Sequence, residues 1–385
     1  MSEEIQEKKE IRMPLCDSLI LSSSPHIQTR NSVQKIMFKV IIALAPAMAA
    51  SIYFFGMAAV KTLICTALFC LLAEALWCIF AKKSIRTTLS DGSAAVSGVI
   101  LALNFNASVP WYVCFIGAFL AIWLGKQVFG GIGCNPFNPA VVARVGLLIA
   151  LPGIMTTWTP TSKIIETAQH RISQNESYCR TFFSADEWKK LQDSVSRKSD
   201  TDVFTCATPL SMASEREKNI KISSEHIFAD IDNRTAWKNY FLGNVGGAMG
   251  ETCTLALIIG GVLLILWRLI NWRVPVFFIG TVYLFTGIIN FFYPNLTPSP
   301  TFHILTGGLM LGAIFMATDM VTSPVTNRGS ALFGIGCGLI TAIIRIWGNY
   351  PEGISFAILF MNALVPFIDK LFIRMPFGTP KKKGA

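Results

Sequence analysis

Two groups of residues in this sequence could carry chemistry. The first is the segment 202–210, DVFTCATPL, in which small and hydroxyl side chains precede a proline. A Thr hydroxyl on an exposed loop can be joined to a nucleotide phosphate by a separate enzyme, which makes Thr208 a candidate modification site. The same pattern is typical of a turn or of a helix start with Thr205 as its cap. From the residues alone, the turn or helix start is the favoured interpretation, and nothing in them proves a modification.

The second group consists of three acidic residues at the ends of apolar segments, Asp91, Asp319 and Asp369. An ionisable group at membrane depth is costly, so it suggests a functional role. Carboxylates suit a cation path because they replace the oxygen ligands of a hard cation or hold a proton. The alternative is that each residue is a helix cap or contacts lipid headgroups.

The elements that must position these residues are membrane helices. Of the 385 residues, 52% are hydrophobic and only 15% are charged, which does not fit a water-facing surface. Apolar segments that reach or approach the ~20 residues of a full crossing can be marked ten times. They are 36–55, 57–80, 92–106, 111–129, 139–151, 250–270, 274–293, 302–318, 330–347 and 354–373. Because 92–106 and 139–151 are short, we expect broken or tilted helices there.

The basic residues indicate the orientation. The chain has 33 Lys and Arg against 23 Asp and Glu, a net charge of +10, which in a soluble protein would raise nucleic acid as a partner. Here the excess is expected on the cytoplasmic side of a membrane, because Lys and Arg are retained there. The short loops around 56, 107–110, 294–301 and 348–353 contain no Lys or Arg. Both termini are therefore expected in the cytoplasm, and no nucleic acid is expected to bind.

A long polar segment divides the chain into two membrane halves. Residues 152–243 contain no apolar run of spanning length and are expected outside the cytoplasm. Five spans on each side of this insert would make the second half enter the membrane inverted. The expected fold is an all-α integral membrane protein of about ten transmembrane helices in two inverted five-helix repeats. Its parts are a cytoplasmic segment 1–35, a first half 36–151, the insert 152–243, a second half 244–373 and a basic tail 374–385.

Three other features of the sequence have a structural interpretation. The ten cysteines include no C-x-x-C pair, so neither a metal site nor an iron–sulfur centre is expected. The Gly- and Pro-rich stretch 130–139 is expected to be a broken helix lining a cavity or an ordinary cytoplasmic loop. The glycines of 243–250 suit close packing better than nucleotide binding, because no strand, turn and helix surround them. His303 is expected at the membrane interface.

Six longer motifs resemble a known family. They are LSSSPHI at 21–27, DGSA at 91–94, KQVFGGIGCNPFNPA at 126–140, GNVGGAMGET at 243–252, FMATDMVTSPVTNRG at 315–329 and RIWGNYPEGISFAILFMNALVPFID at 345–369. Together they resemble the D subunit of the Rnf complex, the ion-translocating ferredoxin:NAD oxidoreductase. That protein is related to the B subunit of the sodium-translocating NADH:quinone reductase. The similarity runs from about residue 20 to residue 375.

The resemblance implies an FMN joined covalently to Thr208 by a flavin transferase. The family signature is D-x-x-[ST]-G-A-T, and Asp202, Thr205, Ala207 and Thr208 match it. Cys206 stands where the family has Gly, and Gly accepts close approaches to another backbone that Cys does not. In some members the resemblance also implies a second, non-covalent riboflavin, whose site no residue here marks.

The function that the resemblance implies is that of a membrane subunit in a redox-driven pump of the bacterial inner membrane. Electron transfer between ferredoxin and NAD would drive Na⁺ or H⁺ translocation, and Asp91, Asp319 and Asp369 would serve cation uptake. Iron–sulfur and flavin subunits would be the partners, because this chain would not be catalytic alone. Two alternatives stay open: the B subunit of a sodium-translocating quinone reductase, and a passive channel of the urea or ammonium type.

Overall fold

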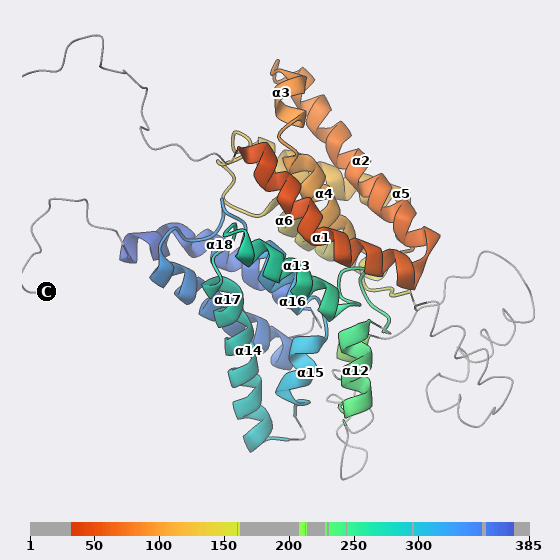
Figure 1. The fold of residues 1–385 in the computed structure, drawn as a ribbon, viewed down its shortest axis with the longest axis vertical. Helices are drawn as coiled ribbons and strands as arrows, with labels where there is room; N and C mark the ends of the chain where they lie inside the picture. The colour runs from red at the N-terminus through yellow and green to blue at the C-terminus, as the bar shows by residue number, and fades with distance from the viewer. Residues whose placement is uncertain are drawn as a thin grey trace, which may run out of the picture.

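The protein is helical throughout the part of the chain that the structure describes (Figure 1). This computed structural model describes residues 32–159, 161, 208–211, 213, 228, 231–243, 245–294, 296–348 and 352–372. No strand occurs in these ranges. The prediction of an all-helical fold is therefore confirmed for the described residues.

The helices before the long polar segment are α1 (Val33–Phe55), α2 (Met57–Phe80), α3 (Ile85–Leu89), α4 (Ser93–Leu103), α5 (Trp111–Phe119), α6 (Pro139–Ala150) and α7 (Pro152–Met155). A π-helix, η2 (Leu120–Gln127), continues α5. Gly56 alone separates α1 from α2 and has a φ of 64°, a left-handed value that glycine adopts without strain.

The helices that follow are α12 (Arg234–Leu242), α13 (Thr254–Leu266), α14 (Arg273–Phe292), α15 (Pro300–Leu305), α16 (Leu309–Leu311), α17 (Asn327–Trp347) and α18 (Ile354–Leu371). A second π-helix, η3 (Gly312–Met316), continues α16. Side-chain caps begin several helices: Ser299 Oγ accepts from Phe302 N at the start of α15, and Thr326 Oγ1 accepts from Gly329 N at the start of α17.

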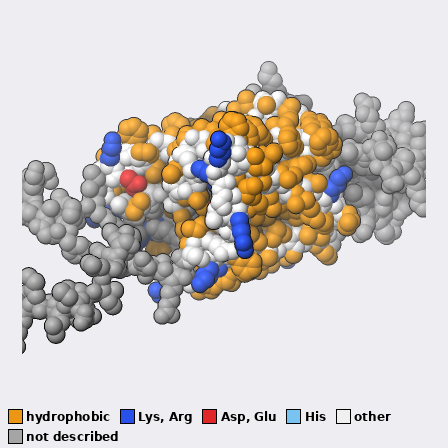
Figure 2. Space-filling model, turned by 90° about the horizontal axis from the view of Figure 1, so that it is seen from above, with side chains coloured by type: hydrophobic (Ala, Val, Ile, Leu, Met, Phe, Trp, Pro, Cys, Tyr) orange, Lys and Arg blue, Asp and Glu red, His pale blue; other side chains and the backbone are white. Residues whose placement is uncertain are grey.

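Five of these helices, α1, α2, α14, α17 and α18, are long and apolar enough to cross a membrane. Their outer faces carry large apolar side chains; Phe80 is 78% exposed and Phe291 is 82% exposed. Figure 2 shows such a face, covered mainly by hydrophobic side chains with few Lys and Arg between them. Such a surface fits a multi-pass membrane protein, because lipid rather than water can cover it.

Packing joins helices from both sides of the long polar segment. On one side α2 packs against α4 and α5, on the other α14 packs against α17, and α1 lies along α13 (Figure 1). Small residues bring these helices close: a Cβ on Gly338 of α17 would lie 2.7 Å from Phe278 O of α14. Glycine at such contacts allows close approach of membrane helices.

The helix break falls where the sequence did not indicate it. The short segments 92–106 and 139–151 form the continuous helices α4 and α6, whose 11 and 12 residues are fewer than a full crossing needs. No break lies inside either helix, and their tilt stays a prediction. The expected span 302–318 is interrupted instead, because Gly307 and Gly308 have φ values of 59° and 33° between α15 and α16. These left-handed glycines end one short helix and allow the next to begin.

A small second core holds the described residues of the long polar segment against the bundle. Leu210, Phe228, Ile231 and Tyr240 pack with Phe302 of α15. Asp232 strengthens this contact, since its Oδ1 accepts from Ser299 Oγ at 2.7 Å and from Trp237 Nε1 at 2.8 Å. Residue 208 is thereby positioned next to the helix break at 307–308.

Candidate functional site

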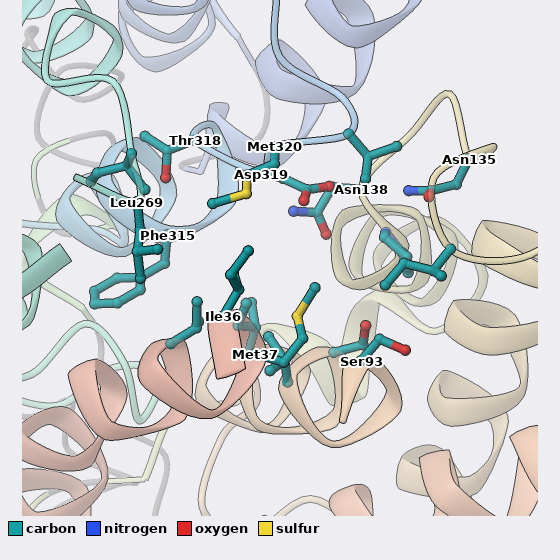
Figure 3. A pocket seen from close by; sticks show the side chains of 18 of the residues that line it. Ile36, Met37, Ser93, Asn135, Asn138, Leu269, Phe315, Thr318, Asp319 and Met320 are labelled. Carbon is teal, nitrogen blue, oxygen red and sulfur yellow. The ribbon is translucent and has the colours of Figure 1, made fainter. Parts of the chain in front are cut away.

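A cavity of about 110 Å³ lies between the two parts of the bundle. Its walls come from α1, α4, the end of η2, the loop before α6, the end of α13 and residues 315–321 (Figure 3). Residues 130–138 form a loop rather than a broken helix, and Ile132, Asn135 and Asn138 of this Gly- and Pro-rich loop line the cavity.

Asp319 lies at this cavity, in the loop that follows η3. In Figure 3 its carboxylate lies beside the side chain of Asn138, with Ser93 across the cavity. Thr322 Oγ1 donates to Asp319 Oδ2 at 3.2 Å. Burial raises the pKa of the Asp319 carboxyl, and the hydrogen bond from Thr322 opposes this shift.

Asn138 ties the two parts of the chain together beside Asp319. Its Oδ1 accepts from Ala140 N at 3.0 Å and so caps α6, while its Nδ2 donates to Met316 O at 3.0 Å. The N-terminus of α6 and the C-terminus of η3 thus meet at a single side chain. The two helix ends place partial charges of opposite sign near the cavity.

Asp91 reaches the cavity through a chain of hydrogen bonds. Its Oδ1 accepts from Ser93 N at 2.8 Å and from Ser93 Oγ at 2.6 Å. Lys126 Nζ donates to Ser93 Oγ at 2.6 Å and forms a buried ion pair with Glu74 of α2. Gln127 Nε2 donates to the same Glu74 oxygen at 2.9 Å. Polar side chains thus connect the surface at Asp91 to a charge buried behind the cavity wall.

Asp369 lies apart from this cavity. Its Oδ1 accepts from Val325 N at 3.2 Å, so it holds the loop before α17 against α18. It is not among the described residues that line the cavity. Of the three acids singled out in the sequence, one lines the cavity, one connects to it and one contacts the neighbouring loop.

Thr208 lines a separate, smaller pocket of about 20 Å³. Tyr240, Gly246, Glu251 and Gly307 contribute to its walls. Thr208 is 6% exposed, and its Oγ1 accepts from Ser211 N at 3.1 Å. The other signature residues, Asp202, Thr205, Cys206 and Ala207, lie outside the described residues.

A cluster of buried charges lies next to the Thr208 pocket. Arg144 of α6 donates to Asn104 O, pairs with Glu352 and lies 3.9 Å from Glu251. A second buried cation, Arg345 of α17, donates to three backbone oxygens at the end of α15: those of His303 at 2.6 Å, Thr306 at 3.1 Å and Gly307 at 2.5 Å. The carboxylates compensate the charge of Arg144, which would be costly to bury alone.

Sequence reasoning missed this cluster and misplaced His303. His303 is 2% exposed and its Nε2 lies 2.7 Å from Thr297 Oγ1, so the expectation of an interfacial residue is wrong. Lys126, Arg144 and Arg345 did carry a signal, because each is a basic residue within an apolar helix. Their partners are distant in the sequence, and no local pattern points to them.

The fold and these sites define a class: a multi-pass helical membrane protein with acidic and basic side chains around a cavity between its two parts. The sequence places it more narrowly. Residues 20–378 match the NQR2, RnfD, RnfE family, and the chain belongs to that family.

Curated relatives cover nearly the whole chain. The D subunit of a proton-translocating ferredoxin:NAD(+) oxidoreductase complex from Clostridium ljungdahlii is 35% identical, over 93% of this chain and 96% of that protein. The D subunit of a Na(+)-translocating ferredoxin:NAD(+) oxidoreductase complex from Acetobacterium woodii is 37% identical, over 95% of this chain and 97% of that protein. The D subunit of an ion-translocating oxidoreductase complex from Stutzerimonas stutzeri is 38% identical, over 91% of this chain and 93% of that protein.

Proposed function

We propose that this chain is the membrane subunit of a redox-driven ion pump, with FMN linked covalently to Thr208. Electron transfer between ferredoxin and NAD would drive the export of Na⁺ or H⁺. Membership of the family supports a translocase subunit that is not catalytic alone. The observation that carries the proposal is the placement of two sites at opposite ends of the same helices. The cavity with Asp319 lies at one end of α4 and of the helix formed by α16 and η3, and the Thr208 pocket lies at the other end.

The residues around Thr208 fit the phosphate part of a flavin better than its ring. The pocket of about 20 Å³ has room for about one water molecule, so it suits a phosphate oxygen. When bound, FMN supplies one-electron transfer, and the protein supplies its position and electrostatic environment. Thr208 Oγ1 would anchor the group, so that it stays bound during turnover.

The cavity at Asp319 would take up the cation from the cytoplasmic side. Asp319 offers carboxylate oxygens and Asn138 an amide oxygen, both of which suit a hard cation or a proton carrier. Asp91 would act beside this cavity, since it is hydrogen-bonded to Ser93 in the cavity wall. Asp369 lies apart from the cavity and would act from its contact with the loop before α17. The relatives do not decide the ion, because one is named for protons and another for Na⁺ at nearly equal identity.

The two parts of the chain would form inverted five-helix halves, 36–151 and 244–373, around the insert 152–243. The packing of α2 with α5 parallels that of α14 with α17, and α1 lies along α13 as its counterpart. In this arrangement the loops with Lys82, Lys83 and Arg86 face the cytoplasm of a bacterial cell, and both termini lie there. Iron–sulfur and flavin subunits would complete the complex, and a flavin transferase would load Thr208.

Covalent flavin is tested by expressing the chain with an active flavin transferase and inspecting a denaturing gel for flavin fluorescence. We expect a fluorescent band for the wild type and none for Thr208→Val. Cys206→Gly, which restores the family signature, serves as the matched positive control. Fluorescence in the control but not in the wild type would show that Cys206 prevents attachment. Fluorescence in neither would contradict the proposal that Thr208 carries FMN.

A further inference from the structure

Glu251 takes part in two of the sites described above. It lines the Thr208 pocket, and its Oε1 lies 3.9 Å from Arg144 Nη2. The Glu251 side chain is only 7% exposed, so little water screens its charge. Charges in such surroundings act on one another much more strongly than in bulk water.

Arg144, the partner of Glu251, connects the two parts of the bundle. It belongs to α6 and donates to Asn104 O at the end of α4, both before the long polar segment. Both of its carboxylate partners follow that segment. Glu251 lies shortly before α13, and Glu352 lies shortly before α18. The ion pairs therefore hold the two parts together on the side of the pocket.

The same contact lies at the far ends of the helices that lead to the cavity. α4 runs from Ser93 at the cavity to Asn104, which accepts from Arg144. α16 and η3 run from Gly308 to the cavity, and a Cβ on Gly308 would lie 3.0 Å from Glu251 Oε1. At 1.5 Å per residue, the 11 residues of α4 separate the two sites by roughly 16 Å.

We propose that Glu251 is the positioning residue that couples charge at Thr208 to the contact between the two parts of the bundle. The inference rests on the proposed function, because it needs the flavin to be carried by Thr208. A gain of negative charge at Thr208 repels the Glu251 carboxylate and drives it toward Arg144. A closer Glu251 competes with Glu352 for Arg144, and this change acts on the ends of both helices that lead to the cavity.

Coupling between two sites is reciprocal, so the charge of Glu251 must also act on the flavin. Loss of a nearby negative charge makes electron uptake easier. In Glu251→Gln we therefore expect the midpoint potential of the Thr208-linked flavin to shift to a more positive value. Glu352→Gln removes the same charge from Arg144 but lies outside the described lining of the pocket, so its shift should be smaller. Glu251→Asp keeps the charge and should keep the wild-type potential.

The experiment is an anaerobic redox titration of the whole purified complex, followed by flavin absorbance. The spectrum of a complex with Thr208→Val is subtracted to isolate the flavin on this chain. If Glu251→Gln does not assemble, Arg144→Gln replaces it, and there the potential should move in the negative direction. Equal shifts in the Glu251 and Glu352 variants, or no shift in either, would overturn the inference. A wild-type chain that carries no flavin on the denaturing gel would contradict the proposed function instead.

Discussion

Lys126 on η2 and Glu74 on α2 form an ion pair that is almost completely buried. Glu74 lies within a long apolar helix, and its partner is 52 residues away in the sequence. The pair fixes η2 against α2 and places the Lys126 ammonium at the cavity wall, within reach of Ser93. A charge inside the bundle is thus part of the wall that an entering ion would meet.

Removal of one member of this pair should destabilise the protein. Lys126→Met leaves the Glu74 carboxylate buried without its partner, which costs about 3–5 kcal/mol in comparable cases. Lys61→Met on the same helix α2 is the matched control, because Lys61 is exposed and should be replaceable without loss. Thermal unfolding in detergent measures both. An unchanged melting temperature for Lys126→Met would show that the pair does not stabilise the bundle.

The three acids should differ in their effect on ion transport. Asp319→Asn removes the carboxylate that lines the cavity, so we expect the largest loss of transport, with flavin attachment unchanged. Asp91→Asn removes the negative charge at the end of the connection through Ser93 and should have an intermediate effect. Asp369→Asn should have the smallest effect, since Asp369 contacts a loop. Ion uptake by vesicles measures this order, and wild-type transport in all three variants would refute the assignment of a cation path.

Close packing at Gly250 should be sensitive to a single methyl group. A Cβ there would lie 2.7 Å from Leu311 Cδ2 and 2.9 Å from Leu103 O, and that backbone oxygen cannot move easily. We expect Gly250→Ala to destabilise the protein by about 1–3 kcal/mol. Gly280→Ala on α14 is the control, because no atom lies within 4 Å of its Cβ position. Equal melting temperatures for the two variants would contradict this packing.

The sequence predicted the helices well because their apolar runs are long and uninterrupted. The limits expected for α2, 57–80, are those observed, and α1 differs by three residues at its start. The break at Gly307 and Gly308 was missed because its glycines resemble the small residues of ordinary helix contacts. Backbone conformation, rather than residue type alone, distinguishes the two cases.

The candidate sites were predictable only in part. The acids Asp91 and Asp319 stood out because they end apolar segments, and the loop 130–139 because Gly and Pro interrupt it. The cluster around Arg144 could not be assembled, since Arg144 and its three partners come from four separate stretches of the chain. Only the tertiary fold brings Glu251 between that cluster and Thr208.

The coupling of electron transfer to ion transport is tested most directly in inverted membrane vesicles that contain the complete complex. Reduced ferredoxin and NAD are added, and the uptake of Na⁺ and of H⁺ is followed for the wild type and for Thr208→Val. We predict that one of the two ions accumulates in wild-type vesicles, and that Thr208→Val abolishes this uptake while the complex still assembles. Undiminished uptake in the Thr208→Val vesicles would contradict the claim that a flavin on this residue drives the pump.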